Sequence, residues 1–277
     1  MTIPRILIVA GSDSGGGAGI QADIKTVTML GGHAMTAITA ITAQNSLGVT
    51  AVHPVPTAIV LAQIDAVAGD FGVDAVKIGM IGSADTAAVL ADRLPQLGVP
   101  IVFDPVMVAT SGAVLADEAT VAAFGRLAAA AALTTPNAPE LAVLTGRAVE
   151  DGDALAAAAA QLAQASGRPV LAKGGHVAAE MGGVAVVRDL LAMPDGAPAR
   201  SFSASRIDTR HAHGTGCTLA SGIATGLAAG LALDVAIDRA RAYVRAALKH
   251  APGLGAGSGP MGHALGLAPF DELRARG

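Results

Sequence analysis

Residues 208–217 carry the sequence Asp-Thr-Arg-His-Ala-His-Gly-Thr-Gly-Cys, and the uncharged, small-residue stretch 218–224 follows directly. This stretch is predicted to be a helix, with Gly214 and Gly216 at its N-terminal end. Two glycines one residue apart expose consecutive backbone N–H groups, which form an anion hole together with the helix dipole. Cys217 stands in that hole, and a helix N-terminus favours the thiolate form of a cysteine. The arrangement suits a transferring phosphoryl group.

The same residues also have a simpler interpretation. Gly-Thr-Gly before a helix can be only a tight turn, and a lone cysteine is commonly a small buried apolar side chain. The choice between the two interpretations depends on what the rest of the chain brings to this point.

Length and composition limit the class of protein. The 277 residues suffice for one large α/β domain or two smaller ones, and because we find no linker or repeat we expect one domain over residues 1–277. The 52% hydrophobic content comes mostly from alanine, and no strongly apolar stretch is long enough to span a membrane. The net charge of −4 argues against a nucleic-acid surface. A single cysteine and no signal-peptide pattern favour a cytoplasmic location.

Short β-rich runs alternate with helical segments. The runs predicted as strands are 6–10, 36–42, 75–78, 100–103, 133–135 and 169–173, with a hairpin over 183–193 and 199–202. The segments predicted as helices are 20–30, 56–69, 85–97, 117–130, 139–144, 153–166 and two long ones from 215 and from 234. This alternation predicts a mostly parallel sheet. Ligands collect at the carboxyl ends of such strands, which here are followed by Gly11, Gly79, Asp104, Asn137 and Lys173.

The common glycine-rich phosphate motifs do not fit this sequence. The glycines at 15–19 lie between a predicted strand and a predicted helix, but their spacing differs from G-x-G-x-x-G. The literal match at 257–262 follows no predicted strand and contains proline, and we expect residues 252–262 to form a surface loop. The chain has no Gly-Lys dipeptide, which excludes a Walker A loop. A nucleotide would therefore be bound by another scheme.

Several segments, in their order along the chain, resemble one family. They are VAGSDSGGGAGIQAD (9–23), AITAQNS (40–46), VKIGMIG (76–82), DPVMVA (104–109), TPNAPE (135–140), KGGH (173–176) and GTGC (214–217). Together they resemble the hydroxymethylpyrimidine/phosphomethylpyrimidine kinases of thiamine biosynthesis, which belong to the ribokinase-like superfamily. The resemblance runs from about Arg5 to Lys249, and the tail from Ala251 adds nothing to it.

This resemblance implies an α/β fold of the ribokinase-like kind, with a central, mostly parallel sheet flanked by helices on both faces. It implies a kinase that uses ATP and Mg²⁺, with a monovalent cation as a further candidate. Such kinases phosphorylate 4-amino-5-hydroxymethyl-2-methylpyrimidine and then its monophosphate, to give the diphosphate. The expected assembly is a homodimer, and the expected partners are small molecules, with neither nucleic acid nor a membrane.

The resemblance also implies roles for residues of this chain. The catalytic set is Gly214, Thr215, Gly216 and Cys217. The ATP-binding set is Lys173, Asn137, Asp208 and Thr209, and the metal-binding pair is Glu140 and Asp104, acting through waters. Many relatives have aspartate in place of Cys217, where it serves as the base; the thiol is either such a base or a positioning group. Glu140 has the alternative of only capping its own helix, and Lys173 that of a solvated surface lysine.

For the pyrimidine the best candidate is Gln44, whose amide offers a donor and an acceptor to a ring nitrogen beside an exocyclic amine. The other positions that the resemblance places around the substrate are Asp23, Ala18, Gly11, Met80 and Val106. Met80 can also be plain core packing. His211 and His213 lie near the anion hole, as phosphate contacts or as turn residues, and residues 109–113 are a candidate flap.

Three other functions compete with this interpretation. They are a pyridoxal or pyridoxine kinase of the same fold, a nucleotide-binding regulator without chemistry, and a dinucleotide dehydrogenase. Gln44 and Met80 favour the pyrimidine without excluding pyridoxal. The joint presence of Glu140, Lys173 and Cys217 argues against the regulator, and the glycine spacing argues against the dehydrogenase.

Overall fold

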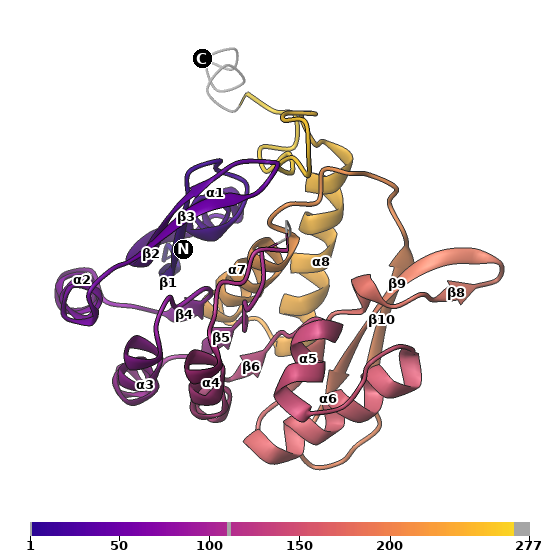
Figure 1. The fold of residues 1–277 in the computed structure, drawn as a ribbon, viewed down its shortest axis with the longest axis horizontal. Helices are drawn as coiled ribbons and strands as arrows, with labels where there is room; N and C mark the ends of the chain where they lie inside the picture. Colours follow the sequence, from indigo (N-terminus) through magenta and orange to yellow (C-terminus); the bar gives the residue numbers. More distant parts are fainter. Residues whose placement is uncertain (1, 110–111, 269–277) are drawn as a thin grey trace.

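The computed structural model describes residues 2–109 and 112–268 (Figure 1). In these ranges the strands are β1 (Arg5–Asp13), β2 (His33–Gln44), β3 (Val49–Pro54), β4 (Ala75–Ile78), β5 (Ile101–Phe103), β6 (Leu133–Thr134), β7 (Val170–Ala172), β8 (Glu180–Met181), β9 (Val184–Ala192) and β10 (Arg200–Ser205). The α-helices are α1 (Gly19–Met29), α2 (Thr57–Asp70), α3 (Ala84–Arg93), α4 (Glu118–Ala130), α5 (Ala138–Thr145), α6 (Gly152–Ser166), α7 (Thr215–Ala228) and α8 (Leu233–Lys249). Short 3₁₀ turns cover Leu94–Leu97 and Gly174–His176.

The strands form one sheet in the order β10-β9-β7-β6-β5-β4-β1-β2-β3, with β8 paired to β9 beside this path. Strand β1 pairs in parallel with β2 and β4, and the parallel pairing continues from β4 through β5 and β6 to β7. The pairs β2–β3, β7–β9, β8–β9 and β9–β10 are antiparallel. The predicted α/β class, the mostly parallel sheet and the antiparallel hairpin near residue 190 are confirmed.

The side chains of β1 show why the sheet is covered on both faces. Leu7 and Val9 pack in one apolar core with residues of α2, α3 and α4. Ile6 and Ile8 point to the other face and pack with residues of α1, α7 and α8. Strands buried on both faces are apolar at successive positions, as residues 6–10 of β1 are. Figure 1 shows the helices on the two sides of the sheet, with α5 and α6 under its β7–β9 end.

Helix α7 is the uncharged helix that follows the anion-hole sequence, and it packs closely against α8. A Cβ atom on Gly222 would lie 2.9 Å from the Cβ of Ala240, and one on Gly226 would lie 2.8 Å from the Cβ of Ala236. The two helix backbones can approach this closely only because α7 presents no side chain there. None of the helices in the described part of the chain is long and apolar enough to cross a membrane.

Three strands, β1, β2 and β10, extend beyond their predicted bounds, and two strands were not predicted. Strand β1 continues beyond Ala10 through a shift in its pairing with β2, which carries it to Asp13. The sequence pattern ended the strand at Gly11 because the residues after it are polar. The short edge strand β3 and the two-residue β8 have exposed, mixed sequences, so no alternation marks them.

The expectation of a surface loop over residues 252–262 is wrong for its second half. Residues 252–256 are exposed, but Met261 is 3% exposed and the neighbouring His263 is 4% exposed. The glycine-rich composition gave no sign of this burial, because the contacts that cause it come from distant elements.

The close contact between α7 and α8 predicts opposite effects for one substitution at two helical glycines. Gly222→Ala places a methyl group 2.9 Å from Ala240 Cβ, so we expect overpacking to lower the free energy of unfolding by about 1–3 kcal/mol. Gly125→Ala in α4 meets nothing within 4 Å and should raise it by up to about 1 kcal/mol, since alanine favours helices. Urea unfolding measures both. Equal effects of the two variants would contradict this packing.

Candidate active site

The anion hole that the sequence predicts is present at the start of α7. Gly214 caps the helix with φ = 89°, and a Cβ there would lie 1.9 Å from the carbonyl oxygen of Gly17. Glycine is therefore required by both the backbone conformation and the close approach. A Cβ on Gly216 would lie 3.1 Å from Lys173 Nζ and 3.3 Å from Asp104 Oδ2. The first turn of α7 thus faces charged groups at the carboxyl ends of the central strands.

A cavity of about 690 Å³ opens at these strand ends. It brings together most of the residues singled out in the sequence, from segments far apart in the chain. The predicted site residues that line it are Gly11, Ala18, Gln44, Met80, Asp104, Val106, Asn137, Glu140, Lys173, Thr209, Gly214, Thr215, Gly216 and Cys217. The simpler interpretation of the Gly-Thr-Gly sequence as an isolated tight turn does not account for this convergence.

Asp23 corrects the prediction that it lies against the substrate. Its side chain is fully buried and does not line the cavity. It forms an ion pair with Lys77 Nζ at 2.8 Å and accepts a hydrogen bond from Ser221 Oγ at 2.7 Å. The helical repeat explains this: Asp23 lies one turn after Gly19 on α1, as Ser221 does after Cys217 on α7. Asp23 therefore joins the two helices one turn below the cavity.

Asp208 is exposed and does not line the cavity, although Thr209 does, so its predicted contact with the nucleotide stays a prediction. The segment before α7 turns the side chain of Asp208 outward. The stretch from 208 to 217 therefore contributes to the site mainly through its second half.

Lys173 forms the centre of a charged cluster at the end of β7. Its Nζ lies 2.6 Å from Asp104 Oδ1 and 3.8 Å from Glu140 Oε2. Thr135 Oγ1 donates a hydrogen bond to the same Asp104 oxygen at 3.0 Å. Burial alone would lower the pKa of Lys173, but the two carboxylates outweigh it and raise that pKa. Lys173 is thus a paired cation on the cavity wall, not a solvated surface lysine.

Glu140 has the capping role that was its alternative. Asn137 Oδ1 accepts from Glu140 N at 2.9 Å, and Asn137 N donates to Glu140 Oε2 at 2.7 Å, which is a capping box at the start of α5. Burial raises the pKa of Glu140 in spite of nearby Lys173. In the described part of the chain no cluster of three or more histidine, cysteine or acidic side chains forms a ready metal site. The metal role of Glu140 and Asp104 therefore stays a prediction.

The prediction of a favoured thiolate at Cys217 is wrong for this structure. Burial raises the pKa of Cys217 to about 11, and the negative charges of Asp23 and Asp104 add to this effect. The positive charge of Lys77 and a hydrogen bond from the Gly19 amide act in the opposite direction without overcoming it. The helix N-terminus alone does not decide the charge of this thiol.

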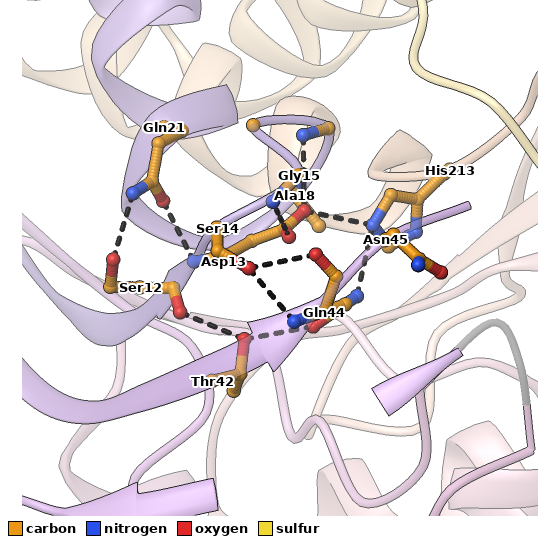
Figure 2. A network of polar contacts seen from close by, with 12 residues as sticks. Ser12, Asp13, Ser14, Gly15, Ala18, Gln21, Thr42, Gln44, Asn45 and His213 are labelled. Atoms are coloured by element: carbon orange, nitrogen blue, oxygen red, sulfur yellow. Dashed lines mark hydrogen bonds and ion pairs between the residues drawn. The ribbon is translucent and has the colours of Figure 1, made fainter. Parts of the chain in front are cut away.

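Two residues of the cavity wall, Asp13 and His213, form contacts that the sequence did not predict. Asp13 was not singled out, yet it lies in the cavity wall and contacts His213, whose Nε2 is 2.9 Å from Asp13 Oδ2 (Figure 2). His213 is 8% exposed, lines the cavity and also contacts Gln44 at 3.1 Å, and its predicted phosphate contact stays a prediction. His211 lies outside the cavity lining. The sequence did carry one signal for Asp13, which is an acidic residue shortly after a predicted strand.

The buried part of the C-terminal segment supports the anion hole from behind. Gly259 O accepts a hydrogen bond from His213 N at 3.2 Å. His263 Nε2 lies 2.9 Å from Thr218 Oγ1, in the first turn of α7, and its carbonyl accepts from the Tyr243 hydroxyl at 2.7 Å. This tail, which added nothing to the family resemblance, thus contacts residues on both sides of the Gly-Thr-Gly-Cys stretch.

The candidate flap over residues 109–113 is described only in part, because positions 110 and 111 lie outside the described residues. Around it, Val108 bridges Val114 and Ala109 N donates to Ala113 O at 2.8 Å. Val108, Ala109 and Gly112 line the cavity.

Comparison with known proteins agrees with this geometry. The family model described as phosphomethylpyrimidine kinase matches residues 13–262. The hydroxymethylpyrimidine/phosphomethylpyrimidine kinase of Streptomyces coelicolor is 47% identical over 96% of this chain and 97% of its own length. A thiamine biosynthesis bifunctional protein of Geobacter sulfurreducens is 48% identical over 94% of this chain, which spans 52% of that longer protein. The pyridoxal kinase of Bacillus subtilis, solved as an ADP complex, superposes with a TM-score of 0.86 at 31% identity and covers 95% of this chain and 98% of its own.

The raised pKa of Cys217 predicts slow alkylation of the folded protein. Because the thiol is neutral up to a pKa of about 11, the rate with iodoacetamide should be low at pH 7 and rise about tenfold per pH unit without levelling off by pH 9. Cys217 is the only cysteine in the chain, so the label reports this site alone. The urea-unfolded chain is the control, and its rate should reach half of its maximum near pH 8.5, the ordinary pKa of about 8.5 for a free thiol. A native profile that reaches half of its maximum at or below about pH 8.5 would show an activated thiolate instead.

Proposed function

The chain belongs to the phosphomethylpyrimidine kinase family, and from this premise we propose that it transfers the γ-phosphoryl group of ATP to two successive acceptors. The first is the hydroxymethyl oxygen of 4-amino-5-hydroxymethyl-2-methylpyrimidine, and the second is the phosphate of the resulting monophosphate, as in thiamine biosynthesis. One observation carries the proposal. The amides that open α7 and the amide side chain of Gln44 line the same cavity, so a phosphate and a pyrimidine can meet in it.

Positioning and charge stabilisation account for most of the chemistry of phosphoryl transfer. The backbone amides of residues 214–217 would receive the charge that develops on the transferring group. Lys173 lies beside this turn, and its ion pair with Asp104 stabilises its positive charge. Its ammonium group would therefore bind the phosphate oxygens of the nucleotide. Asn137 and Thr209 line the same cavity and would contact the nucleotide.

Asp104 and Glu140 suit Mg²⁺ held through waters and nucleotide phosphates. Mg²⁺ keeps several waters and commonly takes one or two carboxylates together with substrate phosphates, which fits a pair of carboxylates better than a closed cage. Both carboxylates lie within 4 Å of Lys173, so their negative charge is already partly balanced. The ion would neutralise the charge of the phosphates when bound. The chain's own part is to hold these carboxylates in place, through Thr135 and the capping box of α5.

The acceptor side of the cavity is built from Gln44 and four neighbours. Met80 is 8% exposed, and its Sδ would lie 3.0 Å from a Cβ on Gly11, so the glycine leaves room for the methionine at the cavity wall. Val106 and Ala18 add small apolar surface. A flat ring with one polar edge fits an apolar wall with a single amide.

Cys217 has two possible roles, and its raised pKa favours the second. A thiol that is neutral at pH 7 is not ready to accept the proton of the alcohol. It can still orient the alcohol, while the departing phosphoryl group takes the proton in a loose transition state. We therefore propose that Cys217 is a positioning contact of the acceptor oxygen.

We further propose a single kinase domain over residues 1–277, a homodimer and a cytoplasmic location, all on the strength of the family resemblance. A monovalent cation near the phosphates belongs to the same proposal. No part of the proposed reaction needs nucleic acid or a membrane.

A pyridoxal or pyridoxine kinase is the second candidate. It is favoured by the likeness to the solved pyridoxal kinase of Bacillus subtilis, whose TM-score is 0.86. The 47% identity to a hydroxymethylpyrimidine/phosphomethylpyrimidine kinase over nearly the whole chain favours the pyrimidine more strongly.

The function is tested by incubating the pure protein with Mg-ATP and either the pyrimidine alcohol or pyridoxal, with products followed by mass. We expect the pyrimidine monophosphate and then the diphosphate, with pyridoxal phosphorylated more slowly. The Cys217→Ala variant should lose at least about tenfold in kcat for the first transfer while KM for ATP stays within about twofold, since the thiol contacts the acceptor only. Faster turnover of pyridoxal would favour the second candidate. No product with either alcohol would refute the proposed kinase activity.

A further inference from the structure

A ring of polar contacts joins the ends of β1 and β2 to the segment before α7 (Figure 2). Its centre is Asp13, which is 3% exposed and lines the cavity. Asp13 Oδ1 accepts a hydrogen bond from Gly15 N at 2.8 Å. Asp13 Oδ2 accepts from Gly17 N at 3.0 Å and from Ala18 N at 2.8 Å. The same oxygen lies 2.9 Å from His213 Nε2. No step of the reaction described above uses this carboxylate.

These donors decide where the proton of the Asp13–His213 contact lies. Burial alone would raise the pKa of Asp13, but the hydrogen bonds from His213 and from the loop amides outweigh it and hold that pKa below its usual value. The carboxylate is therefore ionised at neutral pH and only accepts hydrogen bonds. It follows that His213 Nε2 carries a hydrogen and donates it to Asp13 Oδ2.

The side-chain amide of Gln44 lies against the same His213 nitrogen, and its orientation matters. With Gln44 Nε2 at 3.1 Å from His213 Nε2, two N–H donors face each other. With Gln44 Oε1 at 3.1 Å from Thr42 Oγ1, the single hydroxyl proton of Thr42 is divided between that oxygen and the carbonyl of Ser12, which is 2.9 Å away. This orientation of the amide therefore has one conflict at each end.

Half a turn of the Gln44 amide about its last bond removes the contact between two donors and leaves the Thr42 hydroxyl proton to Ser12 alone. The oxygen and nitrogen of an amide occupy nearly the same space, so the contact distances are kept. The oxygen then shares the His213 Nε2 hydrogen with Asp13 Oδ2, and the NH2 group donates to Thr42 Oγ1, which keeps its own donation to Ser12. We propose that Asp13 is a positioning residue: by holding a hydrogen on His213 Nε2, it fixes the Gln44 amide with its oxygen toward His213 and its NH2 group toward Thr42.

The backbone around Gln44 holds this arrangement in place. Gln44 N donates to Ser14 Oγ at 2.8 Å, and Ser14 Oγ donates to Gln44 O at 2.7 Å. On the other strand, Asp13 N donates to Gln21 Oε1 at 2.9 Å, and Gln21 Nε2 donates to Ser12 Oγ at 2.8 Å. The ends of β1 and β2, which carry Asp13 and Gln44, are thus fixed, so the Gln44 amide responds mainly by turning about its own bond.

The orientation of the Gln44 amide determines the direction in which the substrate ring binds, and this consequence rests on the proposed function. After its contacts with His213 and Thr42, the Gln44 amide keeps one N–H and one oxygen lone pair. An aminopyrimidine offers a ring nitrogen beside an exocyclic amine, and the two edges match. The amine then binds on the His213 side and the ring nitrogen on the Thr42 side. A ring bound in the reverse sense meets a donor with a donor, which is a large penalty in a dry site.

The position of the proton on His213 is measured directly by nuclear magnetic resonance on the full chain labelled with ¹⁵N-histidine. The signals of His213 are assigned by their loss in a His213→Gln variant, among the 7 histidines of the chain. We expect a hydrogen on Nε2, in either the neutral or the doubly protonated ring. A bare Nε2 would overturn the proposal. This measurement needs neither substrate nor activity.

Kinetics test whether the orientation matters for the acceptor. In Asp13→Asn the His213 proton loses its ionised partner, and we expect KM for the pyrimidine alcohol to rise at least about tenfold while KM for ATP stays within about twofold. Asp74→Asn is the matched control. It removes an aspartate that pairs with Arg5 far from the cavity, and it should leave both constants unchanged. Equal changes in the two KM values, or none, would overturn the proposal.

Should Asp13→Asn fail to fold, Thr42→Val tests the other end of the amide. It should raise KM for the alcohol alone, and Thr42→Ser should restore it because the hydroxyl returns. Thr50→Val is the control, since it removes a threonine hydroxyl from the adjacent strand, where it donates to Ala43 O. Full activity of Thr42→Val would overturn the proposal. A wild-type protein inactive on every alcohol would refute the proposed function, while the His213 measurement would still decide this inference.

Discussion

The close approach of the α7 N-terminus to the sheet is the constraint on which the rest of the site depends. Gly214 lets the helix begin against the carbonyl of Gly17, and Gly216 leaves space for Lys173 and Asp104. A side chain at either glycine would push the helix away from the strand ends. Because the approach is that close, backbone amides, a cation and carboxylates from separate βα units line one cavity. On its other side, α7 packs closely against α8 through small residues, and this packing helps to keep α7 against the sheet.

The charges of the site form two groups with different roles. Lys77 and Asp23 make a fully buried ion pair beneath the cavity, and breaking such a pair commonly costs about 3–5 kcal/mol, so Asp23 serves the fold. Lys173 and Asp104 make the second pair, on the cavity wall. Cys217 interacts electrostatically with both groups, but burial has the largest effect on its pKa and raises it. The chemistry of this thiol follows from its surroundings more than from its place on a helix.

The sequence predicted what depends on local pattern and missed what depends on contacts between distant segments. The alternation of apolar strands with helices, the helix after Gly-Thr-Gly and the cavity at the strand ends all follow from local composition and spacing. The inward turn of Asp23 depends on Lys77, which is 54 residues away. The buried His263 depends on Thr218, and the role of Asp13 depends on His213, 200 residues away. No local signal carries such pairings, and residue-by-residue resemblance placed Asp23 on the wrong side of its helix.

The central claim is that one phosphate and one alcohol meet between the α7 amides and Gln44. It is tested most directly by a crystal structure of the protein with the pyrimidine alcohol and a non-hydrolysable ATP analogue. We predict that the terminal phosphate lies within hydrogen-bond distance of the amides of residues 214–217, and that the alcohol oxygen lies about 3–3.5 Å from its phosphorus, the separation of a near-attack arrangement. A pyrimidine bound away from Gln44, or a terminal phosphate that touches none of these amides, would contradict the account.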